Sequence, residues 1–391
     1  GFGFLRMGTT GLVARALGGD DRAAASRVLA RSGVLALAIA LLVMALGPLW
    51  LPAGFALMAP QPELLPLAES YVGMRLYSAP AVLLTYAVVG WFIGSQNTRW
   101  PMLVVVATNL VNIGLDWLFI VELGLASDGA ALATVIAEYT GCGLALLIAW
   151  RAGALRGSSR GDVFGNWSAY RDLLRNNGHL FVRTVCLLAS FAFFTAQSNK
   201  LGTHVLAANT LLLHLLMLAA YAQDGFAYAV EGLAGQYLGA GDLPRFYRSV
   251  RRCALWSGIC ALLTSALLAL LYPQVFGLLT SIEPVRDELV AAVGWLLLMP
   301  LVAAPSYLLD GVFVGSARTR HMMTTMLFSS VVIYLPAWYA LRGQGNDGLW
   351  LAFLLFNGAR GVALAFSFRS IERRSGWLQG SALETGLRAG S

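Results

Sequence analysis

Long apolar segments, separated by short polar ones, run along almost the whole chain. Examples are residues 34–51, 102–121 and 261–272, which lack the alternation of polar and apolar positions that is typical of membrane β-barrel strands. Uniform apolar segments are typical of transmembrane helices, each of which needs about 20 residues to cross a bilayer. Division of the chain at its polar breaks predicts about eleven transmembrane helices.

Composition supports this interpretation. Hydrophobic residues make up 58% of the chain and charged residues only 12%, whereas soluble domains carry about 25% charged residues. The sequence therefore predicts an all-α integral membrane protein that crosses the lipid bilayer many times.

The net charge of +7 would fit a nucleic-acid-binding protein, but the basic residues lie in alternate loops. One set of loops holds only Lys200, Arg286 and Arg342. The other set holds Arg15, Arg22, Arg27, Arg31, Arg99, Arg151, Arg156, Arg160, Arg171, Arg175, Arg245, Arg248, Arg251, Arg252, Arg318, Arg320, Arg369, Arg373, Arg374 and Arg388. Cytoplasmic loops of membrane proteins are enriched in Lys and Arg. The basic charge therefore predicts topology, with a cytoplasmic C-terminus and no nucleic-acid partner.

An internal repeat relates the two halves of the chain at an offset of 221 residues, as from Gly11 to Gly232. Residues 11–31 align with 232–252, and residues 88–99 align with 309–320. The conserved pairs include Asp21 and Asp242, Gly90 and Gly311, and Gly94 and Gly315. A constant offset over so long a stretch indicates two homologous, pseudosymmetric lobes.

The repeat also predicts the domain organisation. We expect an N-lobe over 1–151, a cytoplasmic linker over 152–177, a C-lobe over 178–371 and a cytoplasmic tail over 372–391. Because both copies place the same loops on the basic side, each lobe must hold an even number of helices. The C-lobe segment 178–200 has no counterpart before residue 1. The expected architecture is therefore two six-helix lobes, of which the first helix is absent from this sequence.

Polar residues at membrane depth are costly and mark candidate functional sites. Asn112 and Asp116 lie one helical turn apart, and Thr134 lies in the next predicted helix. Their carboxylate, amide and hydroxyl groups suit a proton or Na⁺ site. The alternative is a satisfied hydrogen-bond network between two helices.

The C-lobe has its own intramembrane charges. Asp224 and Glu231 lie seven residues apart, on nearly the same side of one helix, and Asp310 lies beside Gly311. Arg183 is their candidate ion-pair partner, so that the pair on the helix is either functional or a structural strut. Phe226 and Tyr228 are candidates to line an apolar cavity for a planar organic cation.

The repeat separates these alternatives. Asp224, Glu231 and Asp310 correspond to Gly3, Thr10 and Val89, whereas Asn112 and Asp116 correspond to Ile333 and Ala337. A requirement of the shared fold would tend to recur in both lobes. The asymmetry therefore favours functional roles and two chemically distinct lobe cavities.

No catalytic or metal-binding motif is present in the sequence. The glycine-rich segments 17–21 and 238–242 are typical of helix ends, and the four cysteines have no metal-binding spacing. We therefore predict no enzyme activity, no metal site apart from possible Na⁺ at Asp116, and no cofactor. An intramembrane hydrolase built on Asp224 and Glu231 is disfavoured, because aspartyl chemistry requires two Asp residues on different helices.

Four segments carry a resemblance to a known family: FLRMGTTGL (4–12), GAALATVIAEY (129–139), DGFAYAVE (224–231) and LLDGVFVGSARTR (308–320). The chain resembles the multidrug and toxic compound extrusion (MATE) family, specifically its DinF branch. This resemblance implies twelve helices in two lobes, a bacterial inner-membrane location and export coupled to entry of H⁺ or Na⁺. It also implies that Asn112, Asp116 and Thr134 form the N-lobe cation site and that Asp310 lies where another branch keeps a cation-binding carboxylate.

These considerations predict a secondary active multidrug antiporter that works by alternating access and is a monomer. Its partners would be small organic, often cationic compounds. The alternative within the same superfamily is a flippase for lipid-linked anionic precursors, whose cavity should be lined with Arg.

Overall fold

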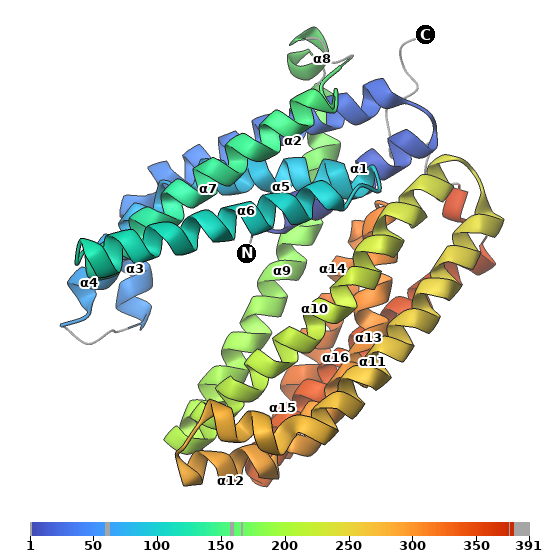
Figure 1. Cartoon of the computed structure of the whole chain (residues 1–391). Coiled ribbons are helices and arrows are strands. Elements are labelled where there is room, and N and C mark those ends of the chain that lie inside the picture. Colours follow the sequence, from blue (N-terminus) through green and yellow to red (C-terminus); the bar gives the residue numbers. More distant parts are fainter. Residues whose placement is uncertain (1, 59–62, 157–159, 166, 375, 379–391) are drawn as a thin grey trace. The chain divides into compact units, whose positions relative to one another are not determined.

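The computed structural model describes residues 2–58, 63–156, 160–165, 167–374 and 376–378, and every regular element within these ranges is a helix (Figure 1). The predicted all-α class is therefore confirmed. The chain divides into two compact units, which we call the N unit (Phe2–Tyr170) and the C unit (from Arg171 onwards). Their boundary lies inside the predicted linker 152–177. The lobe, linker and tail assignments stay predictions, and residues 379–391 of the tail lie outside the described residues.

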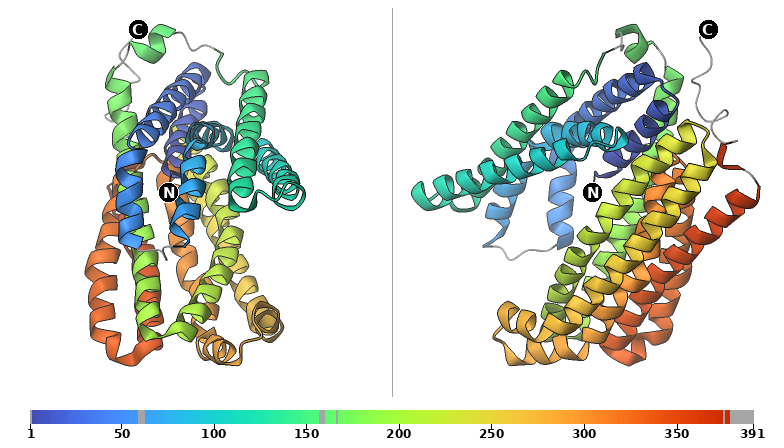
Figure 2. Two further views of the ribbon diagram at one scale, coloured as in Figure 1. Left: turned by 90° about the vertical axis from the view of Figure 1, so that its left-hand side faces the viewer. Right: turned by 45° about the vertical axis from the view of Figure 1, so that its right-hand side comes forward.

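Helix α5 is the centre of the N unit, where it packs against α1, α2 and α7, while α6 pairs with α7 (Figure 2). The elements of this unit are α1 (Phe4–Gly18), α2 (Arg22–Ala45), α3 (Gly47–Met58), α4 (Leu65–Leu76), α5 (Ala79–Gly94), α6 (Arg99–Asp116), the π-helix η1 (Trp117–Glu122), α7 (Ala126–Arg151) and α8 (Arg160–Phe164).

Helix α13 is the centre of the C unit. It packs against α10, α11 and α16, and 67% of its most apolar stretch is buried. The elements are α9 (Trp167–Leu201), which starts just before the unit boundary, α10 (Thr203–Gly239), α11 (Leu243–Leu279), α12 (Glu283–Ala291), α13 (Val293–Gly315), α14 (Thr319–Leu327), the π-helix η2 (Phe328–Tyr334), α15 (Leu335–Leu341), the 3₁₀ helix η3 (Arg342–Gln344) and α16 (Gly345–Arg373).

The number of helices that are long and apolar enough to span a membrane is lower than the predicted eleven. Among the described residues, eight helices qualify, or nine if α4 and α5, bent by 48°, form one broken span. Helix α1 has only 15 residues, fewer than the about 20 that a helix needs to cross a bilayer. In addition, the 55-residue helical segment Thr319–Arg373 is counted as one span. This segment turns back on itself, because α16 packs against α14, η2 and α15.

Two equivalent helix starts show the internal repeat in three dimensions. The Asp21 carboxylate accepts a hydrogen bond from the Ala24 amide at 2.7 Å, and the Asp242 carboxylate accepts one from the Arg245 amide at 2.9 Å. Capping by an acidic side chain satisfies an amide that has no partner within the helix. Each pair is separated by 221 residues, so the sequence repeat is a repeat of structure.

Glycines allow close helix contacts at equivalent positions in both units. A Cβ atom on Gly90 would lie 2.6 Å from the Arg6 carbonyl oxygen, and one on Gly94 would lie 2.8 Å from the Thr10 carbonyl oxygen. In the C unit, Gly311 and Gly315 abut the carbonyls of Ala227 and Glu231 in the same way. Small residues four apart allow membrane helices to approach this closely. Thr10 and Glu231 therefore occupy equivalent places with different chemistry, as the alignment predicts.

Candidate functional site

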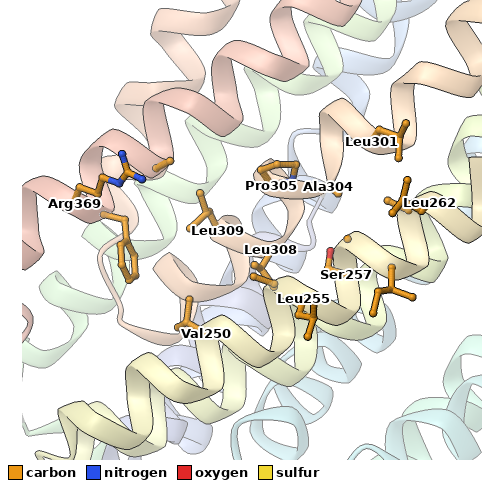
Figure 3. Close-up of a pocket in the computed structure, with 16 residues that line it drawn as sticks. Val250, Leu255, Ser257, Leu262, Leu301, Ala304, Pro305, Leu308, Leu309 and Arg369 are labelled. Atoms are coloured by element: carbon orange, nitrogen blue, oxygen red, sulfur yellow. The ribbon is translucent and has the colours of Figure 1, made fainter.

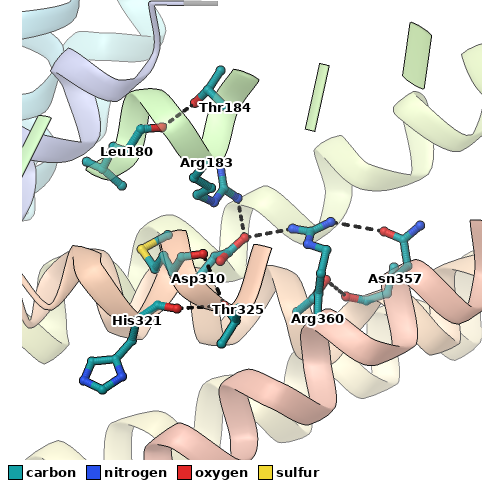
Figure 4. A network of polar contacts seen from close by, with 11 residues as sticks. Leu180, Arg183, Thr184, Asp310, His321, Thr325, Asn357 and Arg360 are labelled. Carbon is teal, nitrogen blue, oxygen red and sulfur yellow. Dashed lines mark hydrogen bonds and ion pairs between the residues drawn. The ribbon is translucent and has the colours of Figure 1, made fainter. Parts of the chain in front are cut away.

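Asp310 lies near the end of α13, on the most buried helix of the C unit, and joins three helices (Figure 4). Its Oδ2 atom accepts hydrogen bonds from Arg183 of α9 and from Nη2 of Arg360 of α16, the latter at 3.0 Å. The three side chains are at most 10% exposed. The partner of Arg183 in this structure is thus Asp310, from a helix 127 residues further along the chain.

Arg360 is held on its other side by its own helix. Its Nη1 atom donates to Asn357 Oδ1 at 3.1 Å, and its guanidinium carbon lies 5.6 Å from the centre of the Phe356 ring. The Nε atom of Arg183 is buried and has no hydrogen-bond partner among the described residues. Two guanidinium groups therefore share the Oδ2 atom of Asp310.

Asp224 of α10 belongs to the same charged neighbourhood. Tyr307, one turn before Asp310, interacts electrostatically with Asp224 as well as with Asp310 and both arginines. Asp224, Phe226 and Tyr228 are partly exposed, whereas Glu231 is 2% exposed. Because Glu231 lies about 10 Å further along α10 than Asp224, the two carboxylates sit at different depths.

Asp310 and Arg183 are candidates from the sequence, whereas Arg360, Asn357 and Tyr307 join the network only in the structure. The signals that point to them are local spacings: Asn357 lies one turn before Arg360, and Tyr307 lies one turn before Asp310. Polar residues at a one-turn spacing in an apolar helix face the same side.

The N unit brings Asn112 and Thr134 together, as the spacing predicts. Asn112 Nδ2 donates to Thr134 Oγ1 at 3.3 Å, and the Thr134 hydroxyl donates to the Ala130 carbonyl oxygen at 2.8 Å. The contact joins α6 to α7. One turn further along, Asp116 ends α6 at the start of the π-helix η1.

The Asp116 carboxylate is incompletely satisfied. Its Oδ1 atom is buried and has no hydrogen-bond partner among the described residues. Buried acceptors are nearly always paired, and a π-helical turn, which is frequent at functional sites, disrupts the regular backbone hydrogen bonding. Since the described residues contain no cluster of three His, Cys, Asp or Glu side chains, a cation at Asp116 would need neutral oxygens such as those of Asn112 and Thr134.

The N unit also contains a partly buried ion pair. Arg75 of α4 and Glu138 of α7 form two parallel hydrogen bonds of 2.8 and 3.0 Å. A bidentate pair of this kind fixes the two helices relative to each other. This geometry favours a structural role for the pair.

Comparison with known proteins gives a consistent result. A family profile described as MatE matches residues 2–118 and 180–339, more than half of the chain. DNA damage-inducible protein F of Escherichia coli (strain K12) is 35% identical over 375 residues, which cover 96% of this chain and 82% of that protein. The probable multidrug resistance protein NorM of Pseudomonas putida is 31% identical, over 91% of this chain and 80% of that protein.

More distant relatives are longer than this chain. Protein DETOXIFICATION 44, chloroplastic, of Arabidopsis thaliana is 29% identical over 305 residues, and the match spans only 56% of that protein. Solved structures share the fold: one described as MATE in the straight conformation gives a TM-score of 0.86 at 21% identity, over 97% of this chain and 85% of that one. An outward-facing multidrug resistance MATE transporter of the MOP superfamily gives 0.85 at 22%, with the same coverage of both chains. The chain therefore belongs to the MatE family of multidrug and toxin extrusion transporters.

Proposed function

We propose that the protein is a secondary active antiporter of the inner membrane that exports small organic, often cationic compounds in exchange for H⁺ or Na⁺. The observation that carries the coupling step is the buried, unpartnered Oδ1 atom of Asp116 beside the Asn112–Thr134 pair. A carboxylate in this position changes charge when it takes up a proton or Na⁺. The free-energy cost of burying Asp116 therefore differs between its ion-bound and ion-free forms. This difference biases the equilibrium between two conformations.

Substrate recognition belongs, in this proposal, to the C unit. Asp224, Phe226 and Tyr228 are partly exposed on α10 and offer a carboxylate and two aromatic faces, groups that favour organic cations. Asp310, Arg183 and Glu231 are buried. We assign these three a positioning role, since Asp310 is already bonded to both arginines.

The test is transport in everted membrane vesicles that contain the protein, in which export from the cytoplasm is measured as uptake into the vesicle lumen. We expect Asp116→Asn to abolish the dependence of efflux on an imposed pH or Na⁺ gradient, because an amide cannot change its charge. Glu122→Gln is the matched control, since Glu122 is an exposed carboxylate at the end of the adjoining π-helix. It should retain coupled efflux.

A separate measurement of drug binding to the purified variant distinguishes coupling from substrate recognition. Asp116→Asn should bind the organic compound with nearly unchanged affinity. Gradient-driven efflux that persisted in Asp116→Asn would show that the coupling group lies elsewhere.

One observation bears on the flippase alternative. Arg183 and Arg360 together carry one more charge than Asp310 neutralises, and an anionic lipid precursor would complement that excess. Asp224 in the same neighbourhood opposes it. Translocation of a lipid-linked anion without any ion gradient, together with absent drug efflux, would favour the flippase.

A further inference from the structure

A groove of about 660 Å³ runs along the surface of the C unit between α11, α13 and α16 (Figure 3). Its walls are almost entirely apolar, with Ala254 and Leu262 on α11 facing Ala304 and Leu308 on α13. Ser257 is one of its few polar lining residues, and its hydroxyl already donates to Gln223 Oε1 at 2.7 Å. The body of the groove is therefore suited to hydrocarbon.

The length of the groove matches one leaflet of a bilayer. Along α11 it extends from Val250 to Leu262, which corresponds to about 18 Å at the rise of an α-helix. Half of a typical hydrocarbon core is about 15 Å thick. Leu255 and Leu262 are 62% and 61% exposed, so this wall would face lipid in a membrane.

Positive charge is concentrated at one end. Arg369 lines the groove near the end of α16, and Arg251 precedes the lining residue Leu255 by one helical turn on α11. Both side chains are exposed, and neither has an ion pair among the described residues. The groove thus pairs a hydrocarbon-sized apolar body with two unneutralised guanidinium groups.

These charges are not a requirement of the repeated fold. At the offset of 221 residues, Arg251 corresponds to Ala30, whereas the neighbouring Arg252 corresponds to Arg31. Arg369 corresponds to Trp150, because residues 127–133 align with 346–352 at an offset of 219. Ala254 and Leu255, one turn after Arg251, both line the groove, whereas only Leu255 of the two residues one turn after Arg252 does. The arginine shared by both lobes is therefore the one on the side of α11 that is turned further from the groove.

We propose that this groove binds one anionic phospholipid, with an acyl chain along α11 and α13 and the phosphate at Arg251 and Arg369. Anionic headgroups are attracted by basic side chains at the membrane surface. The site is distinct from the charge network, although both use α13: Leu308 lines the groove, and Asp310 binds the arginines. The bound lipid would stabilise the packing of α13 against α11 and α16.

Native mass spectrometry of the full chain tests the proposal with phosphatidylglycerol and phosphatidylcholine of identical acyl chains. We expect preferential retention of phosphatidylglycerol, and about fivefold weaker binding for Arg251→Ala and for Arg369→Ala. Arg252→Ala is the matched control at the same depth and should change binding less than twofold. Arg369→Lys keeps the charge and should retain most of the binding, which separates electrostatics from misfolding.

A further variant tests the apolar body. Ala254→Trp places a large side chain in the groove from an exposed position and should weaken retention of both lipids. Equal binding of the two lipids by the unaltered chain would overturn the proposal. So would an Arg252→Ala effect as large as that of the two groove arginines, or displacement of the lipid by free glycerophosphoglycerol.

Discussion

Asp310 is the counter-charge for two buried arginines. Its Oδ2 atom is the shared acceptor for two buried guanidinium groups, and Arg183 keeps a further buried Nε atom without a partner in the described part of the chain. A buried ion pair adds little stability over apolar packing, but removal of one partner leaves an uncompensated charge. The stability of the C unit should therefore depend strongly on this carboxylate.

We expect Asp310→Asn to lower the stability of the purified protein by about 3–5 kcal/mol, because two buried cations lose their counter-charge. Thermal unfolding in detergent measures the loss. Asp287→Asn, at an exposed carboxylate of α12, is the control and should change stability little. Addition of Arg183→Gln to Asp310→Asn should restore part of the loss, and an unchanged melting temperature in Asp310→Asn would contradict this account.

At the scale of helices, glycine pairs decide how closely α1 approaches α5 and α10 approaches α13. Gly94 and Gly315 abut the carbonyls of Thr10 and Glu231, so a side chain at either position would meet backbone atoms that cannot move alone. Close helix contacts in membranes depend on small residues because van der Waals packing, not the hydrophobic effect, holds the helices together.

We expect Gly94→Ala to destabilise the N unit by about 1–3 kcal/mol, since the added Cβ atom must push the two helices apart. Gly73→Ala is the control, because a Cβ atom there would meet no atom within 4 Å. Differential scanning fluorimetry of the two variants makes the comparison. Equal melting temperatures for both variants would contradict the proposed close contact.

At the scale of the whole molecule, the asymmetry of basic residues predicts the orientation in the membrane. The loops with Arg286 and Arg342 are poor in basic residues, whereas the segments around Arg251 and Arg374 are rich in them. Insertion places the richer loops in the cytoplasm. The proposed anionic-lipid groove, with its arginines near Arg251, would then open to the inner leaflet.

Single cysteines introduced into a variant without native cysteines should report this orientation. In intact cells, an impermeant maleimide should label Glu283→Cys, at the start of α12, and leave Arg374→Cys unlabelled until the membrane is permeabilised. Both sites flank helix ends, so accessibility differs only by the side of the membrane. The reverse labelling pattern would exclude a cytoplasmic C-terminus.

Several features were determined by the sequence alone. Apolar segment length predicts helices and membrane insertion, because in a bilayer every backbone polar group must be satisfied within its own segment. The repeat predicts equivalent positions, and Asp21 with Asp242 and Gly94 with Gly315 occupy equivalent places in the two units. The spacing of Asn112 and Thr134 anticipates a contact because it depends only on two adjacent helices.

Other features were decided only by the tertiary structure. Asp310 binds Arg183 and Arg360, which lie 127 and 50 residues away in the sequence. These contacts depend on the rotation of α9, α13 and α16 about their axes and on their relative positions along the membrane normal. The same is true of the unpartnered oxygen of Asp116 and of the groove that ends at Arg369. Helical periodicity is a local property that a sequence displays directly, whereas the pairing of side chains between distant helices follows from packing of the whole unit.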